Sequence, residues 1–424
     1  MIGPLAISDQ HKKFGTAFAI YILFMTLTLG GGVTSLVEEK GLEFAPGLLM
    51  MGVGFTLLAA GVSKEGEFRK ALRSTAGDRI LRLRLMWTHQ FQFIGIYRAE
   101  HLINEAQKNL KPGVDPPYGL KVLEGGSPIG LDPRATVFNG LDDLGITSAT
   151  ALIRWYLRHH SSERGPGTLV PLLVIFQRSP ACLIYRVQSA LPKGGIEVEH
   201  LTGKRFRFAD PGDPATMEFL TLCKMRNVQN IQWDSSAGSE ENPTDKLQDA
   251  GTADYRLGYS FNEGYRAAKN GDARDEYDYA PLMRIFDQKD LYADVLFTRK
   301  EIMDNSKKAA AVLDVAAKIE ESYAFFVDRD KERAADVNKF LEEYCHDWWH
   351  RVKGKHQLYD TPAKELIDLL RDAWGAPRPS GRLLGNRNCW SELEKAVQNE
   401  QLGKPSKLAH FDWLTSGPAA SSLE

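Results

Sequence analysis

The stretch "TLVPLLVIFQRSPACLIYRVQS", Thr168–Ser189, consists mainly of aliphatic and aromatic residues and is broken at Ser179–Pro180. Two shorter runs follow it, "GIEVEHL" (Gly195–Leu201) and "KRFRFAD" (Lys204–Asp210), separated from it and from each other by turn-forming residues. Short β-prone runs bounded by turn residues are typical of strands. Because the connectors are short, these runs predict a small antiparallel meander of about three or four strands.

Helices are expected on both sides of this sheet. Upstream, Ser148–His160 has an apolar side and can be capped by Thr147 or Ser148. Downstream, "PATMEFLTLCKMRN" (Pro214–Asn227) predicts another helix. Residues 111–134 are rich in Pro and Gly, which indicates loops. Residues 111–233 are therefore predicted to form an α/β subdomain.

A polar stretch, residues 234–252, has no large apolar side chain apart from Leu247 and predicts a linker. Beyond it the chain is expected to be almost wholly helical, with Asp304 or Asn305 capping a long helix. The buried stripe of that helix would consist of Val312, Ala316, Ile319, Tyr323 and Phe326.

The segment before the α/β subdomain changes period within a few residues. "LRLRLMWTHQFQF" (Leu81–Phe93) alternates apolar and polar residues, which favours a strand. From Phe91 through Leu110 the spacing of apolar residues favours a helix.

Two long uncharged runs lie near the N-terminus, Phe14–Val37 and Phe44–Ser63, joined by the short connector Glu38–Glu43. As helices they would be about 36 Å and about 30 Å long, and a bilayer core is about 30 Å thick. The runs therefore predict a transmembrane helical hairpin with spans at about 14–37 and 44–63.

Basic residues near these runs predict their orientation, because cytoplasmic flanks carry an excess of Lys and Arg. The connector carries Lys40 alone, beside three glutamates. The flanking cations are Lys12, Lys13, Lys64, Arg69, Lys70, Arg73, Arg79, Arg82 and Arg84. Both termini are expected in the cytoplasm of a multi-pass, inner-membrane protein, and the segment 64–110 is expected to contact anionic lipid headgroups.

Small residues recur at helical spacing in both runs and predict close helix packing within the membrane. The positions are Thr26, Gly30 and Thr34 in the first run, and Gly52, Thr56 and Ala60 in the second. Neither run carries Asp, Glu, Lys, Arg or His, and one hairpin cannot enclose a pore. A homo-oligomer is therefore expected if the hairpin conducts anything; otherwise it is an anchor.

"HDWWH" places His346 and His350 four residues apart, on one face of an expected helix. This spacing can hold zinc, and Asp347 would stand where HExxH proteases carry their general base. The same histidines would face solvent opposite the apolar stripe, so an ordinary solvated pair is the alternative. No other cofactor is predicted.

Alternating arginines and aromatics in "KRFRF" make Arg205 and Arg207 candidates for phosphate or nucleotide contact, although a strand with outward arginines gives the same pattern. The net charge of -2 gives no basic field of the kind that binds nucleic acid. The four cysteines form no CxxC pair, which argues against a disulfide framework.

These patterns together predict a membrane-anchored α+β protein. A two-helix transmembrane hairpin is followed by a cytoplasmic α/β subdomain with a small antiparallel sheet and by a mainly helical C-terminal subdomain. The expected boundaries are 1–63 for the hairpin, 64–110 for the juxtamembrane segment, 111–233 for the α/β subdomain, 234–252 for the linker and 253–424 for the helical subdomain.

The function expected from this layout is that of a membrane effector or pore involved in signalling, whose cytoplasmic body binds a ligand or a protein partner. The sequence carries no diagnostic catalytic motif, so an enzyme is not favoured. Two alternatives are a membrane-tethered metal-dependent hydrolase that uses the HDxxH helix and a membrane scaffold that recruits cytosolic proteins.

Overall fold

The computed structural model divides the chain into two compact units, Met1–Asp78 and Arg79–Glu424. All the elements below belong to the second unit. The residues described are 80–109, 118–126, 130–159, 168–187, 195–207, 214–234, 253–269, 277–287, 292–328, 333–345, 349, 363–375, 384–385 and 387–400.

The first of two five-stranded sheets has the strand order β2-β1-β3-β10-β4. Strand β1 is parallel to both β2 and β3, and β10 runs antiparallel between β3 and β4. The strands are β1 (Ile80–Arg84), β2 (Gly119–Leu123), β3 (Leu144–Ser148), β4 (Leu169–Val174) and β10 (Asp294–Arg299). This sheet and its helices form the first lobe.

Strand β4 forms the first part of the apolar stretch Thr168–Ser189. All of its residues are buried, so it carries a continuous apolar run in place of an alternating one. Pro171 cannot donate to a ladder, and it lies in an edge strand where the register with β10 shifts between Leu296 and Phe297.

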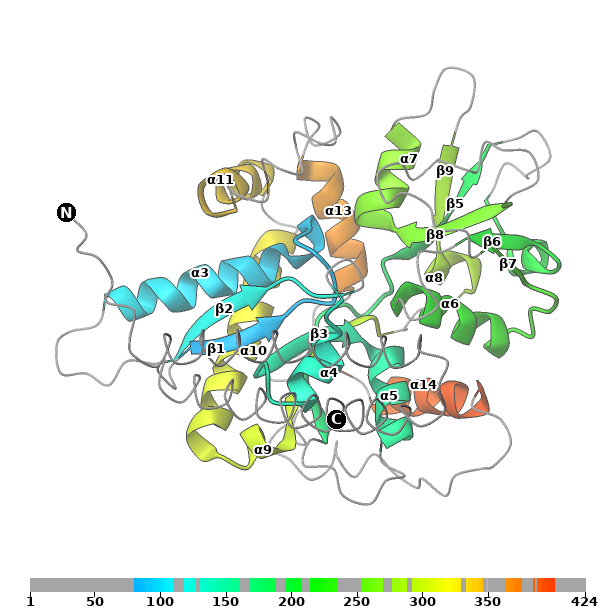
Figure 1. Cartoon of the computed structure of the whole chain (residues 1–424). Coiled ribbons are helices and arrows are strands. Elements are labelled where there is room, and N and C mark those ends of the chain that lie inside the picture. The colour runs from blue at the N-terminus through cyan, green and yellow to red at the C-terminus, as the bar shows by residue number, and fades with distance from the viewer. Residues whose placement is uncertain are drawn as a thin grey trace, which may run out of the picture. The chain divides into compact units, whose positions relative to one another are not determined.

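Helices cover both faces of the first sheet, as the alternation along β10 shows. Leu296 packs into the core of α3 (Ile94–Lys108) and α10 (Ser306–Val327), while Val295 and Phe297 pack into the core of α4 (Pro133–Phe138) and α5 (Ala149–His159). Neighbouring residues of a strand point to opposite faces, so the two helix pairs lie on opposite sides (Figure 1).

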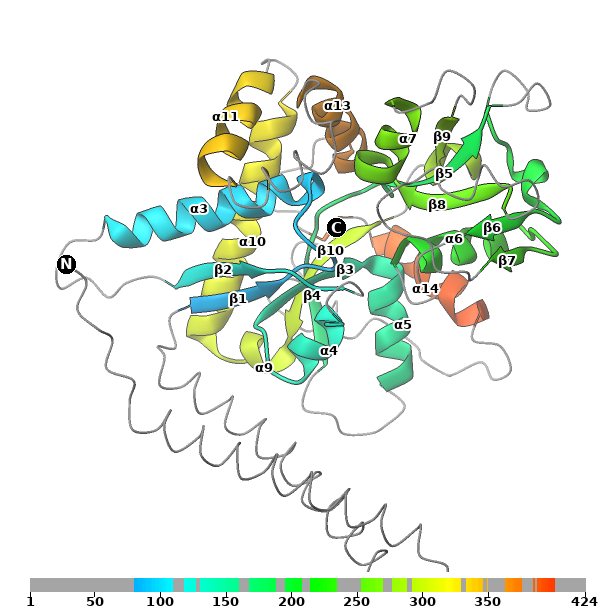
Figure 2. The same ribbon diagram turned by 45° about the horizontal axis from the view of Figure 1, so that its top comes forward.

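The second sheet has the order β7-β6-β8-β5-β9. Strand β6 is parallel to β7 and β8, and β5 runs antiparallel between β8 and β9. The strands are β5 (Ala181–Arg186), β6 (Arg205–Arg207), β7 (Gln232–Asp234), β8 (Tyr255–Tyr259) and β9 (Tyr277–Pro281). Helix α6 (Pro214–Met225), the π-helical turn η4 (Ser260–Gly264) and α7 (Tyr265–Lys269) complete the second lobe (Figure 2).

Both sheets follow one plan, because each has three neighbouring parallel strands followed by an antiparallel strand inserted before the last strand. The inserted strand of the second sheet, β5, comes directly after β4 of the first, and the inserted strand of the first sheet, β10, comes after β9 of the second. The chain therefore passes between the lobes twice. We call residues 175–180 the first crossover and residues 282–293, which include α8 (Leu282–Ile285), the second crossover.

The remaining elements are short turns or belong to the C-terminal part. The turns are η1 (Phe91–Phe93), which precedes α3, and η3 (Val198–Leu201). The helices are α9 (Lys300–Met303), which joins β10 to α10, and α11 (Ala334–Tyr344), α13 (Ala363–Trp374) and α14 (Arg387–Glu400).

The predicted fold class is wrong. The described chain forms two mixed five-stranded sheets, not one small antiparallel meander, and three strands of these sheets, β8, β9 and β10, lie in the part expected to be helical. Strands β4 and β5 are close in sequence but belong to different sheets, and "GIEVEHL" contains the 3-10 turn η3 instead of a strand. Which distant segments pair as strands is decided by tertiary packing, and local periodicity does not show it.

The membrane assignment is corrected as well. Within the residues described, no helix combines the length and apolarity needed to cross a bilayer. The predicted spans, 14–37 and 44–63, and their packing positions Thr26, Gly30, Thr34, Gly52, Thr56 and Ala60 lie outside those residues. The predictions of a two-span membrane location, of a bilayer, anionic lipid or homo-oligomeric partner, and of a membrane effector, tethered hydrolase or scaffold depended on the overturned fold class and are wrong with it.

Candidate functional site

Polar side chains collect where the strands of the first sheet end. Strand β3 ends at Ser148, and the antiparallel β10 begins at its register partner Asp294, so both lie at the same edge of the sheet. The first crossover leaves from this edge, and the backbone amides of Ile175 and Phe176 donate to the Asp294 carbonyl over 2.7 Å and 3.2 Å. In open α/β sheets the carboxyl ends of the strands are where ligands bind.

Ser148 organises the start of α5. Its hydroxyl lies 3.0 Å from the hydroxyl of Thr150 and accepts a hydrogen bond from the amide of Ala151 over 3.2 Å. Both hydroxyl residues are buried. The sequence proposed Ser148 as a helix cap, and the structure places this cap at the carboxyl edge of the sheet.

Asp294 is the carboxyl group at this edge. It is 2% exposed, and its Oδ2 has no hydrogen-bond partner within the part that the structure describes. Burial raises the pKa of this carboxyl well above its usual range, because the low-dielectric interior disfavours the charged form. A neutral carboxyl group can donate one hydrogen bond and accept others.

Gln92 provides a second unsatisfied group nearby. It is 1% exposed, and neither atom of its side-chain amide has a partner among the described residues. Its backbone carbonyl accepts a hydrogen bond from the hydroxyl of Tyr323 over 2.6 Å. Burial, and secondarily the charge of Asp294, raises the pKa of Tyr323, so the tyrosine lies within electrostatic range of both groups.

The second lobe carries buried polar groups at the ends of β6 and β8. Arg207 ends β6 and is 2% exposed, and Ser260 follows β8 and is buried. In the first crossover, Ser179 donates a hydrogen bond to the carboxylate of Glu218 on α6, and both residues are buried. The Ser179–Glu218 hydrogen bond links the first crossover to α6 of the second lobe.

Of the two arginines proposed for phosphate contact, Arg205 is exposed and Arg207 is buried. The Arg205 amide donates to Asp254 Oδ2 over 2.9 Å, which ties it to the start of β8. The two arginines therefore differ in burial, a difference that the sequence pattern alone did not reveal. Phosphate contact by either residue stays a prediction.

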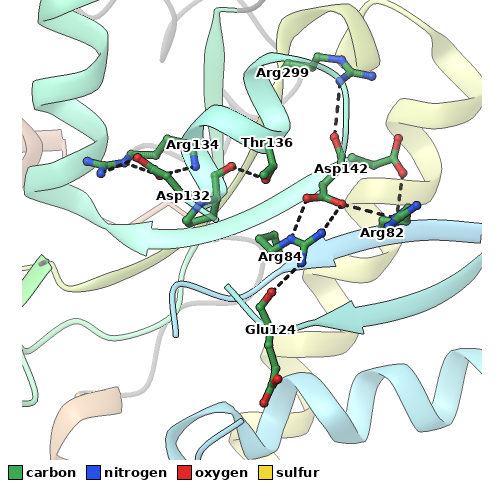
Figure 3. Close-up of polar contacts among 10 residues, drawn as sticks. Arg82, Arg84, Glu124, Asp132, Arg134, Thr136, Asp142 and Arg299 are labelled. Carbon is green, nitrogen blue, oxygen red and sulfur yellow. Dashed lines mark hydrogen bonds and ion pairs between the residues drawn. The ribbon is translucent and has the colours of Figure 1, made fainter. Parts of the chain in front are cut away.

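A second polar cluster lies at the amino end of β3 and is structural (Figure 3). The buried Asp142 pairs with Nε of Arg84 over 2.9 Å and with Nε of Arg82 over 3.5 Å, both on β1. Arg299 of β10 donates to the carbonyl of Val137 over 3.0 Å. These contacts join β1, α4 and β10 around one buried carboxylate, and its charge is matched within the fold.

The predicted zinc pair, His346 and His350, lies outside the described residues. Within those residues, no group of three or more His, Cys, Asp or Glu side chains is arranged to hold a metal ion. Zinc at these histidines stays a prediction.

Sequence reasoning missed Gln92, Glu218 and Asp294 as candidates. The available signal was position: "ADVLFTR" puts one acid, Asp294, directly before the apolar residues Val295, Leu296 and Phe297. Using that signal requires β10 to be recognised as a strand, and the stretch was expected to be helical.

No family model matches the chain, and no curated protein matches it. Among solved structures, it is similar to a zinc-bound ligand-binding component of an ABC-type import system from Staphylococcus aureus, at 12% identity and a TM-score of 0.46, over 79% of this chain and 96% of that chain. It is also similar to an alkanesulfonate-binding protein from Xanthomonas axonopodis bound to MOPS, at 14% identity and a TM-score of 0.45, over 76% and 91% of the two chains. Both TM-scores are below 0.5, so the zinc and the sulfonate are properties of those proteins.

Proposed function

We propose that the two lobes bind one small polar molecule at the place where the carboxyl edges of both sheets meet the crossovers. The observation that carries the proposal is the repeated strand order around one pair of crossovers. In an open α/β sheet the ligand lies beyond the carboxyl ends of the strands, where the strand order reverses. Here that reversal occurs at β1 and β3 in the first sheet and at β6 and β8 in the second.

The unsatisfied buried groups support this location. A buried polar atom without a partner costs about 1–3 kcal/mol, so such atoms usually serve a ligand, an ion or a water. Gln92 and Asp294 present three such atoms on the first lobe. A ligand that hydrogen-bonds to them would recover that free energy.

The charges favour a ligand with an anionic part. Arg207 is a buried guanidinium at the end of β6, in register with Arg256 of β8, and arginine suits planar carboxylate, phosphate or sulfonate groups. The buried Asp294 carboxyl group and the Gln92 amide suit hydrogen-bonding groups at the other end of the molecule. Two lobes joined by short crossovers can close on such a ligand by hinge motion.

The test combines native mass spectrometry of the purified chain with thermal-shift screening against small carboxylates, phosphates and sulfonates. A ligand at about 100 times its Kd stabilises the folded state by about 2.7 kcal/mol. We expect this shift to be lost in Arg207→Met, to be partly retained in Arg207→Lys and to be kept in Arg205→Met, the exposed arginine on the same strand. The proposal fails if no small molecule co-purifies or shifts Tm, or if Arg205→Met and Arg207→Met lose the shift equally.

A further inference from the structure

Each crossover between the lobes is held by a different C-terminal helix. In the first crossover, the amide of Arg178 donates to the carbonyl of Ala373 on α13 over 3.0 Å. The Arg178 guanidinium also pairs with Asp372 over 2.7 Å. Gly375, just after α13, lies so close to Gln177 that an added Cβ would be 2.9 Å from the Gln177 Cβ. Helix α13 is therefore fixed to the backbone of this crossover.

The second crossover is held by α14. Tyr292, close to the end of that crossover, packs against Trp390 with ring centroids 5.6 Å apart. Trp390 is fully buried, and its indole N–H donates to the carbonyl of Leu384 over 2.9 Å. The hydroxyl of Tyr292 lies directly against Gly385, where a Cβ would collide with it.

Both helices also contact both lobes. Helix α13 packs on α10 of the first lobe and on η4 of the second, and α14 packs on α5 of the first lobe and on α6 of the second (Figure 1). Leu393 and Val397 of α14 share one core with Leu152 of α5 and Phe219 of α6. Each helix therefore spans the boundary that its crossover passes.

The crossovers are bonded to each other as well. The Ala293 amide donates to the Phe176 carbonyl over 3.0 Å, and the Ile175 amide donates to the Asp294 carbonyl over 2.7 Å. The connection between the lobes is thus a short two-stranded unit that continues the β10–β4 ladder, with one C-terminal helix fixed to each strand.

We propose that α13 and α14 form a brace that sets the angle between the lobes, and that the lobes reorient only when one of these helices leaves its crossover. Hinge motion requires φ/ψ changes in the connecting residues. A change at Arg178 breaks its bond to Ala373, and a movement of Tyr292 breaks its packing with Trp390. The brace acts in the ligand-free chain, so it stands or falls independently of the proposed function.

Hydrogen–deuterium exchange of the full chain tests the first arm of the brace. The double variant Arg178→Ala, Asp372→Ala removes an exposed ion pair without touching either core. We expect exchange in residues 175–180 and 292–296 to accelerate roughly twofold to fivefold, the scale of an exposed ion pair. The matched control is Lys318→Ala, which removes a pair of the same 2.7 Å length on α10, and we expect no change in the crossovers.

Trp390→Phe tests the second arm, because it keeps an aromatic ring and removes the N–H that bonds Leu384. We expect about tenfold faster exchange in residues 292–296, the scale of one buried carbonyl left without a partner. The brace is refuted if the crossovers exchange at the native rate in both the double variant and Trp390→Phe. It is also refuted if all strands of both sheets accelerate equally, since that outcome reports global destabilisation and not hinge release.

Discussion

At the scale of single residues, Asp294 belongs to the candidate site, and its burial also affects the stability of the fold. Its carboxyl group is buried at the start of β10, and one oxygen lacks a partner among the described residues. Burial raises the pKa of this group well above its ordinary value near 3.9. The folded chain therefore binds a proton there more tightly than the unfolded chain does.

The sign of the resulting pH dependence follows directly. The stabilising contribution of protonated Asp294 is complete below the unfolded-state pKa and is lost as pH rises towards and through the folded-state pKa. Asp294→Asn removes the titrating group, so its stability relative to the native chain should grow as the pH rises from the unfolded-state pKa, about 3.9, towards the raised folded-state pKa. Urea unfolding across that range measures the difference. Asp314→Asn, at an exposed position on α10, is the control, and equal growth in both variants would contradict the prediction.

Gly95 is a second decisive position, because the ring of Tyr323 lies directly against its Cα. A Cβ at Gly95 would overlap the Cγ, Cδ2 and Cε2 atoms of that ring. Glycine therefore allows α3 and α10 to approach closely enough for the Tyr323 hydroxyl to reach the Gln92 carbonyl.

Gly95→Ala should therefore be destabilising, although alanine is the better helix former. We expect a loss of about 1–3 kcal/mol from overpacking, against a gain of up to about 1 kcal/mol in helix propensity. Thermal unfolding measures the balance. Because the collision is with the ring, Tyr323→Leu in the same chain should reduce the cost of Gly95→Ala, and strictly additive effects would argue against it.

At the scale of elements, local signals in the sequence were reliable and pairing was not. Of the strand predicted over Leu81–Phe93, only Leu81–Arg84 belongs to β1. Helix α3 and the buried stripe of α10 were predicted from periodicity and are confirmed. The long helix shows why: its cap and its apolar face are set by residues a few positions apart. Strand β10 obeys no such rule, since its partners β3 and β4 lie more than a hundred residues upstream.

The cap of α10 can be tested against its neighbour. The sequence left Asp304 and Asn305 as alternatives, and the structure shows the Asn305 side chain accepting a hydrogen bond from the Lys308 amide over 3.1 Å. Asn305→Ala should cost about 1 kcal/mol, the usual value for a lost N-cap. Asp304→Ala, which removes only an exposed pair with Lys300, should cost less than half of that in the same urea titration. A larger loss from Asp304→Ala would reverse the assignment.

At the scale of the whole described unit, the sequence indicated one group of short strands flanked by helices, but not two sheets. The turn at Ser179–Pro180 looked like a hairpin connector, and it is instead part of a crossover between sheets. The candidate site was hidden for the same reason. Gln92, Ser148 and Asp294 are far apart in sequence, and only the order of the strands brings them close to the same edge of the first sheet.

The cores also cross the boundary between the lobes. Phe261 and Tyr265 of the second lobe belong to the core of α3 and α10, and Val295 and Phe297 of the first sheet share a core with Phe206 of the second. We therefore expect residues 79–424 to unfold in a single calorimetric transition, with equal calorimetric and van't Hoff enthalpies. Two resolved transitions, or an enthalpy ratio well above one, would show that the lobes unfold separately.

The late position of β10 has a consequence for synthesis on the ribosome. The second lobe's strands, residues 181–281, are translated without interruption, whereas the first sheet lacks its fourth strand in spatial order until residue 299 has been made. Until then β3 and β4 have no strand between them, and both are strands whose residues are all buried in the finished fold. Exposed apolar strand edges are templates for aggregation. The first sheet, most of whose strands are translated first, is thus completed after the second sheet. The nascent chain must keep the edges of β3 and β4 covered while the second lobe is translated.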